Sequence, residues 1–250
     1  MALASMSEIF ERMARNGQEF WEVVLADDMD ERQVSREASM AKMLTTWQAM
    51  QESADSYTGR KRSVSGLVGG DGMKMRQYTF RGCAMTGGYV SEVIAEALSM
   101  AESNACMRRI VAAPTAGACG VLPAVLLPLC KYEELTQHQL LEALYVAAGI
   151  GSVIAYKASI AGASGGCQAE IGTASAMAAG ALVALRGGEG EQIGHAVAMA
   201  LKNLMGLVCD PVAGLVEVPC VKRNVIGAVN AVSAADMALA GIESRIPVDE

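Results

Sequence analysis

Three cysteines in glycine-rich surroundings are the residues of this sequence best suited to chemistry. Cys167 lies in Ser164-Gly165-Gly166-Cys167-Gln168-Ala169-Glu170, Cys209 in Gly206-Leu207-Val208-Cys209-Asp210-Pro211, and Cys220 in Val218-Pro219-Cys220. Thiolates are the side chains best matched to iron-sulfur clusters, and glycine lets backbone amides approach the sulfides and donate hydrogen bonds to them. The three cysteines are therefore candidate ligands of one iron-sulfur cluster.

The spacing of two of these cysteines requires a break in the helical chain between them. Cys209 and Cys220 would lie about 16 Å apart on one continuous helix, which is too far for one cluster. Pro211, Gly214 and Pro219 end one helix and prevent the next from beginning before Cys220. A loop can then bring the two sulfur atoms together, although spacing alone also fits cysteines that merely pack in a core.

Two of the cysteines are expected at the first residue of a helix. Gly165-Gly166 precedes Cys167 and Pro219 precedes Cys220, so helix N-terminal amides would face an anionic cluster from two directions. The other four cysteines carry no such signal and are expected to be core residues: Cys83, Cys106, Cys119 and Cys130.

The elements around these residues are predicted to be helices. Long runs of Ala, Gly, Val, Leu and Ile with few aromatic residues favour closely packed buried helices, and no alternating strand pattern occurs. The fold class is therefore all-α. The predicted helices span residues 90–103, 121–130, 136–158, 168–185, 191–207 and 223–240.

The division of the chain follows a change in sequence character near residue 57. Residues 7–56 mix charges with apolar residues at helical spacing, which predicts an N-terminal helical arm over residues 1–57. Residues 58–250 are expected to form the cluster-binding helical domain, giving one domain overall. Two segments rich in glycine, residues 59–72 and 113–120, are expected to be loops, and the first has the cations and small polar residues of a binding loop.

The charge and composition of the chain argue against some classes of binding partner. The 250 residues carry a net charge of −7, which disfavours nucleic acid and anionic membrane surfaces. Residues 110–130 are uncharged but contain three prolines, which argues against a membrane span. No secretion signal is apparent at the start, and seven cysteines without disulfide or C-x-x-C spacing fit a reducing cytoplasm.

Three ordered segments resemble the α chain of iron-sulfur-dependent L-serine dehydratase. They are Ala113-Pro114-Thr115-Ala116-Gly117, Gly165-Gly166-Cys167-Gln168-Ala169-Glu170 and Cys209-Asp210-Pro211-Val212-Ala213-Gly214-Leu215-Val216-Glu217-Val218-Pro219-Cys220. The resemblance runs from about Ser63 to the end of the sequence. It also implies that α chains usually continue past Pro247-Val248-Asp249-Glu250, so we expect a terminal segment to be missing.

The resemblance implies a four-iron four-sulfur cluster held by Cys167, Cys209 and Cys220, with one iron open to substrate. That iron would act as a Lewis acid on L-serine while a base removes the Cα proton, giving aminoacrylate and then pyruvate and ammonia. Family loops near the substrate resemble segments around Lys61, Ser63, Ser65, Thr115 and Gly117, which are the candidate substrate-binding residues; ordinary turn and cap chemistry is the alternative for them.

No residue of the sequence stands out as the base. His138 is expected to be exposed at a polar helix start, and His195 to be a core histidine. The resemblance implies a companion β chain in a homo- or hetero-oligomer, so the base is sought on that partner.

Three other functions remain open. A cluster-dependent L-cysteine desulfidase would need nearly the same site. A dehydratase dependent on pyridoxal phosphate would use Lys157 as the Schiff base and the glycines at 162–166 as a phosphate site, but it would require an α/β framework. A non-catalytic helical subunit would bind no iron at all.

Overall fold

Helices are the regular elements throughout residues 3–250, the part of the chain described by the computed structural model, and no strand occurs among these residues. The predicted all-α class is confirmed. In chain order the elements are α1 (Met6–Asn16), α2 (Phe20–Arg32), α3 (Arg36–Asp55), α4 (Asp71–Phe80), α5 (Gly87–Ala105), η1 (Ala116–Ala118), α6 (Val121–Tyr132), α7 (Gln137–Lys157), α8 (Gly162–Leu185), α9 (Gly190–Asn203), η2 (Val212–Gly214) and α10 (Cys220–Leu239).

Local signals in the sequence set the ends of α7. The Thr136 hydroxyl accepts a hydrogen bond from the Gln139 amide at 3.2 Å, and the Gln139 side chain accepts one from the Thr136 amide at 2.9 Å. This reciprocal cap satisfies two amides that the helix itself cannot. At the other end of the helix, the positive charge of Lys157 in the last turn interacts favourably with the negative end of the helix dipole. The predicted range 136–158 is therefore close to the observed helix.

Two helices differ from prediction. Helix α9 ends at Asn203 instead of residue 207, because the Leu204 amide bonds to Leu201 in a tight turn and Gly206 takes a positive φ of 97°. Helix α4 was not predicted, since Gly72 is its sole buried residue and it lacks an apolar face. Both differences reflect a weak or misleading hydrophobic period.

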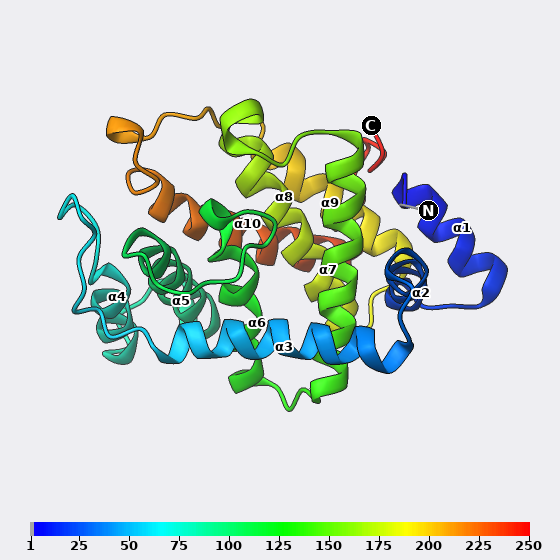
Figure 1. Cartoon of the computed structure of the whole chain (residues 1–250), viewed down its shortest axis with the longest axis horizontal. Helices are drawn as coiled ribbons and strands as arrows, with labels where there is room; N and C mark the ends of the chain where they lie inside the picture. The colour runs from blue at the N-terminus through cyan, green and yellow to red at the C-terminus, as the bar shows by residue number, and fades with distance from the viewer. Residues whose placement is uncertain (1–2) are drawn as a thin grey trace.

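Helix α8 lies at the centre of the core and packs against α6, α7, α9 and α10 (Figure 1). Glycine allows the closest of these approaches. A Cβ on Gly180 would lie 2.2 Å from Cδ1 of Ile150 on α7, and one on Gly227 of α10 would lie 2.7 Å from Cγ2 of Ile171 on α8. Larger residues at these crossings would push the helices apart.

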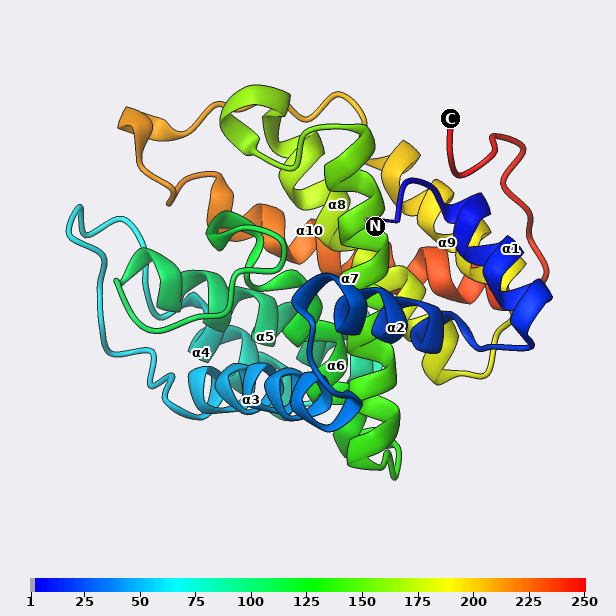
Figure 2. The ribbon, with the colours of Figure 1, turned by 45° about the vertical axis from the view of Figure 1, so that its right-hand side comes forward.

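The N-terminal helices cover one side of this core. Helix α2 packs against α7, α3 against α7 and α5, and α1 against α2 and α9; Figure 2 shows α2 lying across α7. Ile9, Phe20 and Trp47 are buried in the same hydrophobic cluster as residues of α6 to α8. The arm thus lies on the core, while the domain boundary at 57/58 stays a prediction.

By length and apolar composition alone, α7 is the one helix of residues 3–250 that could cross a membrane. Its buried residues, which include Leu144, Ile150 and Val153, belong to the central hydrophobic cluster, and α2, α3 and α8 pack around it. A core helix of a folded protein has this same composition, so the observation gives weak support for a membrane span.

One prediction about the cysteines is wrong. Cys83 is exposed in the turn that follows α4, whereas Cys119 is buried and Cys106 and Cys130 are partly buried. The turn at Gly82 carries Cys83 away from the core, which the residue type alone did not reveal. All seven cysteines have free thiols.

Candidate functional site

Loops from distant parts of the chain gather at one end of the helical core. The segments 59–70 and 204–219 lie at the same end of the molecule in both views (Figures 1 and 2). Between them α10 begins at Cys220, and α8 begins beside the 204–219 loop. The candidate residues from the sequence fall mainly in these segments.

Cys167 follows a break in α8. Gly166 has φ 77° and ψ 176°, which interrupts the helix, so the regular part of α8 starts at Cys167 as predicted. A Cβ on Gly166 would lie 2.7 Å from the Leu207 carbonyl oxygen and 3.6 Å from the Cys209 amide nitrogen. Both the backbone conformation and the close approach require glycine here. The break therefore places Cys167 against the segment that carries Cys209.

Two hydrogen bonds hold that segment on α8. The Gln168 amide donates to the Leu207 carbonyl at 2.9 Å, and the Gly206 amide donates to the Gln168 side-chain oxygen at 2.8 Å. Gln168 thus uses its backbone and its side chain to fix the chain just before Cys209. The predicted loop between Cys209 and Cys220 is present, and α10 begins at Cys220.

The three thiols differ in exposure but interact electrostatically. Cys167 is buried, Cys220 is partly buried and Cys209 is exposed. Burial raises the pKa of Cys167 and of Cys220, and the charge interaction between Cys167 and Cys220 raises the pKa of Cys220 further. Cys209 also contributes to the raised pKa of Cys167. A charge on one of these thiols therefore changes the pKa of another, as expected for groups that lie close together.

Arg223 supplies positive charge to this group from the first turn of α10. Its Nη1 lies 3.0 Å from Sγ of Cys167, 2.9 Å from the Val208 carbonyl oxygen and 2.5 Å from Oδ1 of Asp210. Burial raises the pKa of Cys167, and the hydrogen bond and positive charge of Arg223 oppose part of that increase. A guanidinium beside a thiol favours the thiolate, which is the form that binds iron.

A second group of residues joins the loop 59–70 to the segment before Cys220. Ser63 donates a hydrogen bond to Oε2 of Glu217 at 2.8 Å, Ser65 donates to the same oxygen, and the two serine oxygens lie 3.1 Å apart. Glu217 is buried and precedes Cys220 by three residues. The two serines predicted to bind substrate therefore lie together beside the cysteine segment.

The far end of this loop is held by a buried carboxylate on α5. Glu102 accepts hydrogen bonds from the amides of Gly70 at 3.0 Å and Asp71 at 2.8 Å, and from the Tyr57 hydroxyl. These amides open α4 and have no partner within the helix, so Glu102 caps it. Lys61 does not take part in these hydrogen bonds. Its side chain is exposed, lines a shallow pocket with Glu102 and makes no hydrogen bond within residues 3–250.

A third group joins the loop 113–120 to α8 and α10. Thr115 donates a hydrogen bond to Oε1 of Glu170. The buried Asn224 side chain donates to the carbonyl oxygens of Gly117 at 2.8 Å and Cys220 at 3.1 Å, and it accepts from the Gly120 amide at 2.9 Å. Asn224 therefore ties this loop to the cysteine at the start of α10.

The donor set fits a cluster better than a single metal ion. Within residues 3–250, no three His, Cys, Asp or Glu side chains lie close enough to hold one ion. Each thiolate of a cluster binds a different iron, so its cysteines need not share one ligand sphere. Thiols at the start of α10 and after the break in α8, with Cys209 in the loop that packs on that break and the Arg223 guanidinium on Cys167, suit a bulky anionic group.

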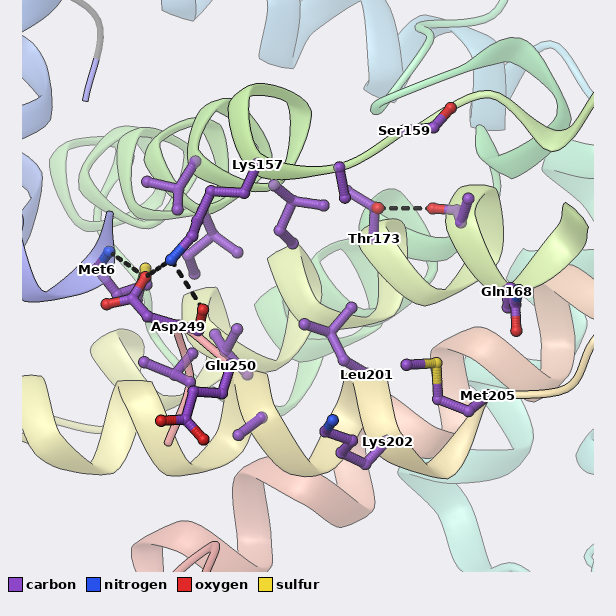
Figure 3. Close-up of a pocket in the computed structure, with 18 of the residues that line it drawn as sticks. Met6, Lys157, Ser159, Gln168, Thr173, Leu201, Lys202, Met205, Asp249 and Glu250 are labelled. Atoms are coloured by element: carbon purple, nitrogen blue, oxygen red, sulfur yellow. Dashed lines mark hydrogen bonds and ion pairs between the residues drawn. The ribbon is translucent and has the colours of Figure 1, made fainter. Parts of the chain in front are cut away.

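Two pockets adjoin the turn that carries Cys167. One, of about 430 Å³, is open and is lined by residues 162–166, Gln168 and the 206–209 segment including Cys209. The other, of about 420 Å³, lies between α7, α8 and α9 and is lined mainly by apolar side chains (Figure 3). Gly165 and Gln168 line both, so this turn separates them.

The pocket of Figure 3 is closed at one side by the last residues of the chain. Asp249 accepts hydrogen bonds from the Met6 amide at 2.9 Å, and its Oδ1 lies 3.1 Å from Nζ of Lys157. The rest combines apolar side chains such as Leu201 and Met205 with polar ones that include Thr173 and Lys202. None of the three candidate cysteines lines this pocket, so the candidate site is the group of loops around them.

The structure offers no base among the histidines. His138 is exposed, as predicted, and pairs with Glu142 at 2.9 Å at the start of α7. His195 is partly buried on α9, where its Nδ1 accepts a hydrogen bond from the Ser244 amide at 3.3 Å. Neither contacts the loops that carry the cysteines.

Sequence reasoning missed four polar side chains of the site: Glu170, Glu217, Arg223 and Asn224. Glu170 and Glu217 stand inside the cysteine-containing segments, where a charge within an apolar run was a usable signal. Arg223 and Asn224 follow Cys220 by three and four residues, on the same face of α10. That helical spacing could have suggested them.

Comparison with known proteins gives a consistent result. Residues 15–250 match the family described as "Serine dehydratase alpha chain". The chain is 45% identical over 229 residues to the "Probable L-serine dehydratase, alpha chain" of Bacillus subtilis (strain 168), covering 92% of this chain and 76% of that protein. It is 38% identical over 249 residues to the "L-serine dehydratase, alpha chain" of Peptoniphilus asaccharolyticus, covering 99% of this chain and 85% of that protein.

Proposed function

The chain belongs to the serine dehydratase alpha chain family, and from this premise we propose that it converts L-serine to pyruvate and ammonia as the α chain of an iron-sulfur-dependent L-serine dehydratase. The observation that carries the cofactor assignment is the position of Arg223, three residues after Cys220: its guanidinium donates to Sγ of Cys167 and to the carbonyl oxygen of Val208, the residue before Cys209. Removal of water from L-serine yields aminoacrylate, which tautomerises to an imine and is hydrolysed to the two products.

Cys167, Cys209 and Cys220 would hold the four-iron four-sulfur cluster. When bound with one iron free of protein ligands, such a cluster supplies a Lewis acid for the departing hydroxyl group. The Arg223 guanidinium would offset negative charge on the Cys167 thiolate. The Gln168 amide, next to Cys167, donates its hydrogen bond to the Leu207 carbonyl oxygen. The protein thus fixes its ligands through α8, α10 and the loop between α9 and α10.

The loops around the cysteines present small hydroxyl groups for the substrate. Ser63 and Ser65 are oriented by Glu217, and Thr115 is oriented by Glu170. With Gly117 they remain the proposed substrate-binding residues. Lys61 has the weakest support, because its exposed side chain makes no hydrogen bond to these groups within residues 3–250.

A companion β chain is the proposed partner, since the named relatives are α chains. Apolar side chains stand exposed on the two loops beside the site: Val64 is 98% exposed and Leu67 63% on one, and Val212 51% and Val216 48% on the other. Exposed apolar groups that border a site are suited to a protein interface. We propose that the β chain covers these loops and provides the base that the histidines of this chain do not.

The alternative that uses pyridoxal phosphate loses its main support. Lys157 would have to form the Schiff base, yet its ammonium group binds the Asp249 carbonyl oxygen at 2.8 Å and the Asp249 carboxylate at 3.1 Å. The all-α fold also lacks the α/β framework that this alternative requires. An L-cysteine desulfidase would use the same cluster, and substrate comparison separates the two.

The test is anaerobic reconstitution of the chain with its β partner, followed by iron and sulfide analysis and assays with L-serine and L-cysteine. We expect a four-iron four-sulfur cluster and pyruvate formation from L-serine. Cys167→Ala, Cys209→Ala and Cys220→Ala should each abolish both, whereas the matched control Cys83→Ala, at an exposed thiol away from the site, should abolish neither. Full activity in any of the three variants would remove that residue from the site.

A further inference from the structure

Glu170 is a carboxylate within the candidate site for which the cysteine chemistry gives no role. It lies one helical turn after Cys167 on α8, and residues three apart on a helix are neighbours on one face. Its partner Thr115 belongs to the loop 113–120, which Asn224 ties to the carbonyl oxygen of Cys220. The carboxylate therefore lies beside the segments that carry Cys167 and Cys220.

The surroundings of this carboxylate leave it short of partners. Thr115 donates one hydrogen bond to Oε1, and no other hydrogen bond or ion pair of Glu170 occurs within residues 3–250. An ionised carboxylate can accept about four hydrogen bonds. The nearby guanidinium of Arg223 is already engaged by Cys167, Val208 and Asp210. Most of the acceptor capacity of Glu170 is thus free.

Two glycine backbones pack closely against the carboxylate. A Cβ on Gly117 would lie 2.6 Å from Oε1 and 2.7 Å from Oε2 of Glu170, and one on Gly162 would lie 2.9 Å from Oε2. Any side chain at these positions would collide with the carboxylate. Glycine at both positions therefore lets the two backbones approach the carboxylate, and a group that binds beside them must be compact.

We propose that the Glu170 carboxylate binds the α-ammonium group of the amino-acid substrate. The inference rests on the proposed function, because that function places an amino acid beside the cysteines. An ammonium group is compact, carries three donors and needs a negatively charged partner when it leaves water. Thr115, one of the predicted substrate-binding residues, then acts as a positioning residue through its hydrogen bond to Glu170.

The test compares two ligands that differ at one group. L-alanine carries the α-ammonium, whereas L-lactate has a hydroxyl there and keeps the carboxylate and the methyl group; neither has a β-hydroxyl to lose, so neither can undergo the dehydration. Calorimetric titration of the reconstituted α and β chains with each ligand, alongside iron and sulfide analysis, gives readouts independent of turnover. The variant is Glu170→Gln, which keeps the size and an oxygen acceptor for Thr115 but removes the charge.

We expect Glu170→Gln to weaken L-alanine binding about 10- to 100-fold, the range of a charge-assisted hydrogen bond, with L-lactate affinity and cluster content unchanged. The control Glu142→Gln, at a carboxylate that pairs with His138 on α7, should change neither ligand. Equal weakening of both ligands, no weakening, or loss of the cluster would overturn the inference. If the unmodified enzyme forms no pyruvate from L-serine, the proposed function fails, while the comparison of L-alanine with L-lactate still decides the role of Glu170.

Discussion

The helical core and the loops around the cysteines use glycine and polar side chains in different ways. In the core, Gly180 and Gly227 lie at helix crossings, where the absence of a side chain lets α7 and α10 come close to α8. In the loops, Gly166 breaks a helix, and buried polar groups join segments that are distant in sequence. Asn224 and Glu102 are the main examples, each with three partners or more.

This difference shows how one chain can combine a stable helical core with a site whose side chains are held in fixed positions. Burial of apolar surface is favourable in almost any orientation, so it stabilises the body without fixing individual atoms. Hydrogen bonds depend on distance and angle, so Asn224 and Gln168 can fix the positions of Cys220 and Cys209. Changes in the two regions should therefore have separable effects on stability and on the site.

The largest expected contrast is in thiol reactivity. Burial raises the pKa of Cys119 from 9.0 to about 12, so the thiolate that reacts with alkylating agents is about 1,000-fold scarcer there than in an ordinary thiol. Cys209 is exposed in its loop. During timed alkylation of the cluster-free chain at pH 8, read by mass spectrometry, Cys209 should react at least 1,000-fold faster than Cys119. Comparable rates for the two would show that the buried region opens as readily as the loops.

A substitution in the core should reduce stability and leave the site intact. Ile150 is fully buried and contacts Gly180, so Ile150→Ala removes packed methyl groups and should lower the free energy of unfolding by about 2–5 kcal/mol. Denaturant titration measures this change. Iron bound per folded molecule should equal that of the unmodified chain. A loss of iron without a loss of stability would mean that the core also positions the cysteines.

A substitution in the site should have the opposite pattern. Asn224→Leu leaves the Gly120 amide and the Gly117 carbonyl without their partner, which should lower the free energy of unfolding by about 1–3 kcal/mol, less than Ile150→Ala does. Cluster content and pyruvate formation should fall much more than stability. If Asn224→Leu retains a full cluster, the hydrogen bonds of Asn224 do not position Cys220.

The sequence predicted most helices because their signals are local. The run of apolar residues placed α7 within one residue at each end, and the prolines before Cys220 placed the start of α10. Predictions failed where local signals were weak, as at α4, or where residue type was taken for burial, as at Cys83. The end of α9 was missed because a tight turn at Leu204 overrides an apolar run.

The amino-acid sequence by itself determined the all-α class, the breaks that precede Cys167 and Cys220, and the segments that identify the family. Only the tertiary structure decided which side chains meet. Ser63 and Glu217 are 154 residues apart, and Thr115 and Glu170 are 55 apart, so their contacts depend on how α5, α8 and α10 cross. Periodicity and turn chemistry act over a few residues, whereas pairing across the fold is fixed by the packing of whole helices.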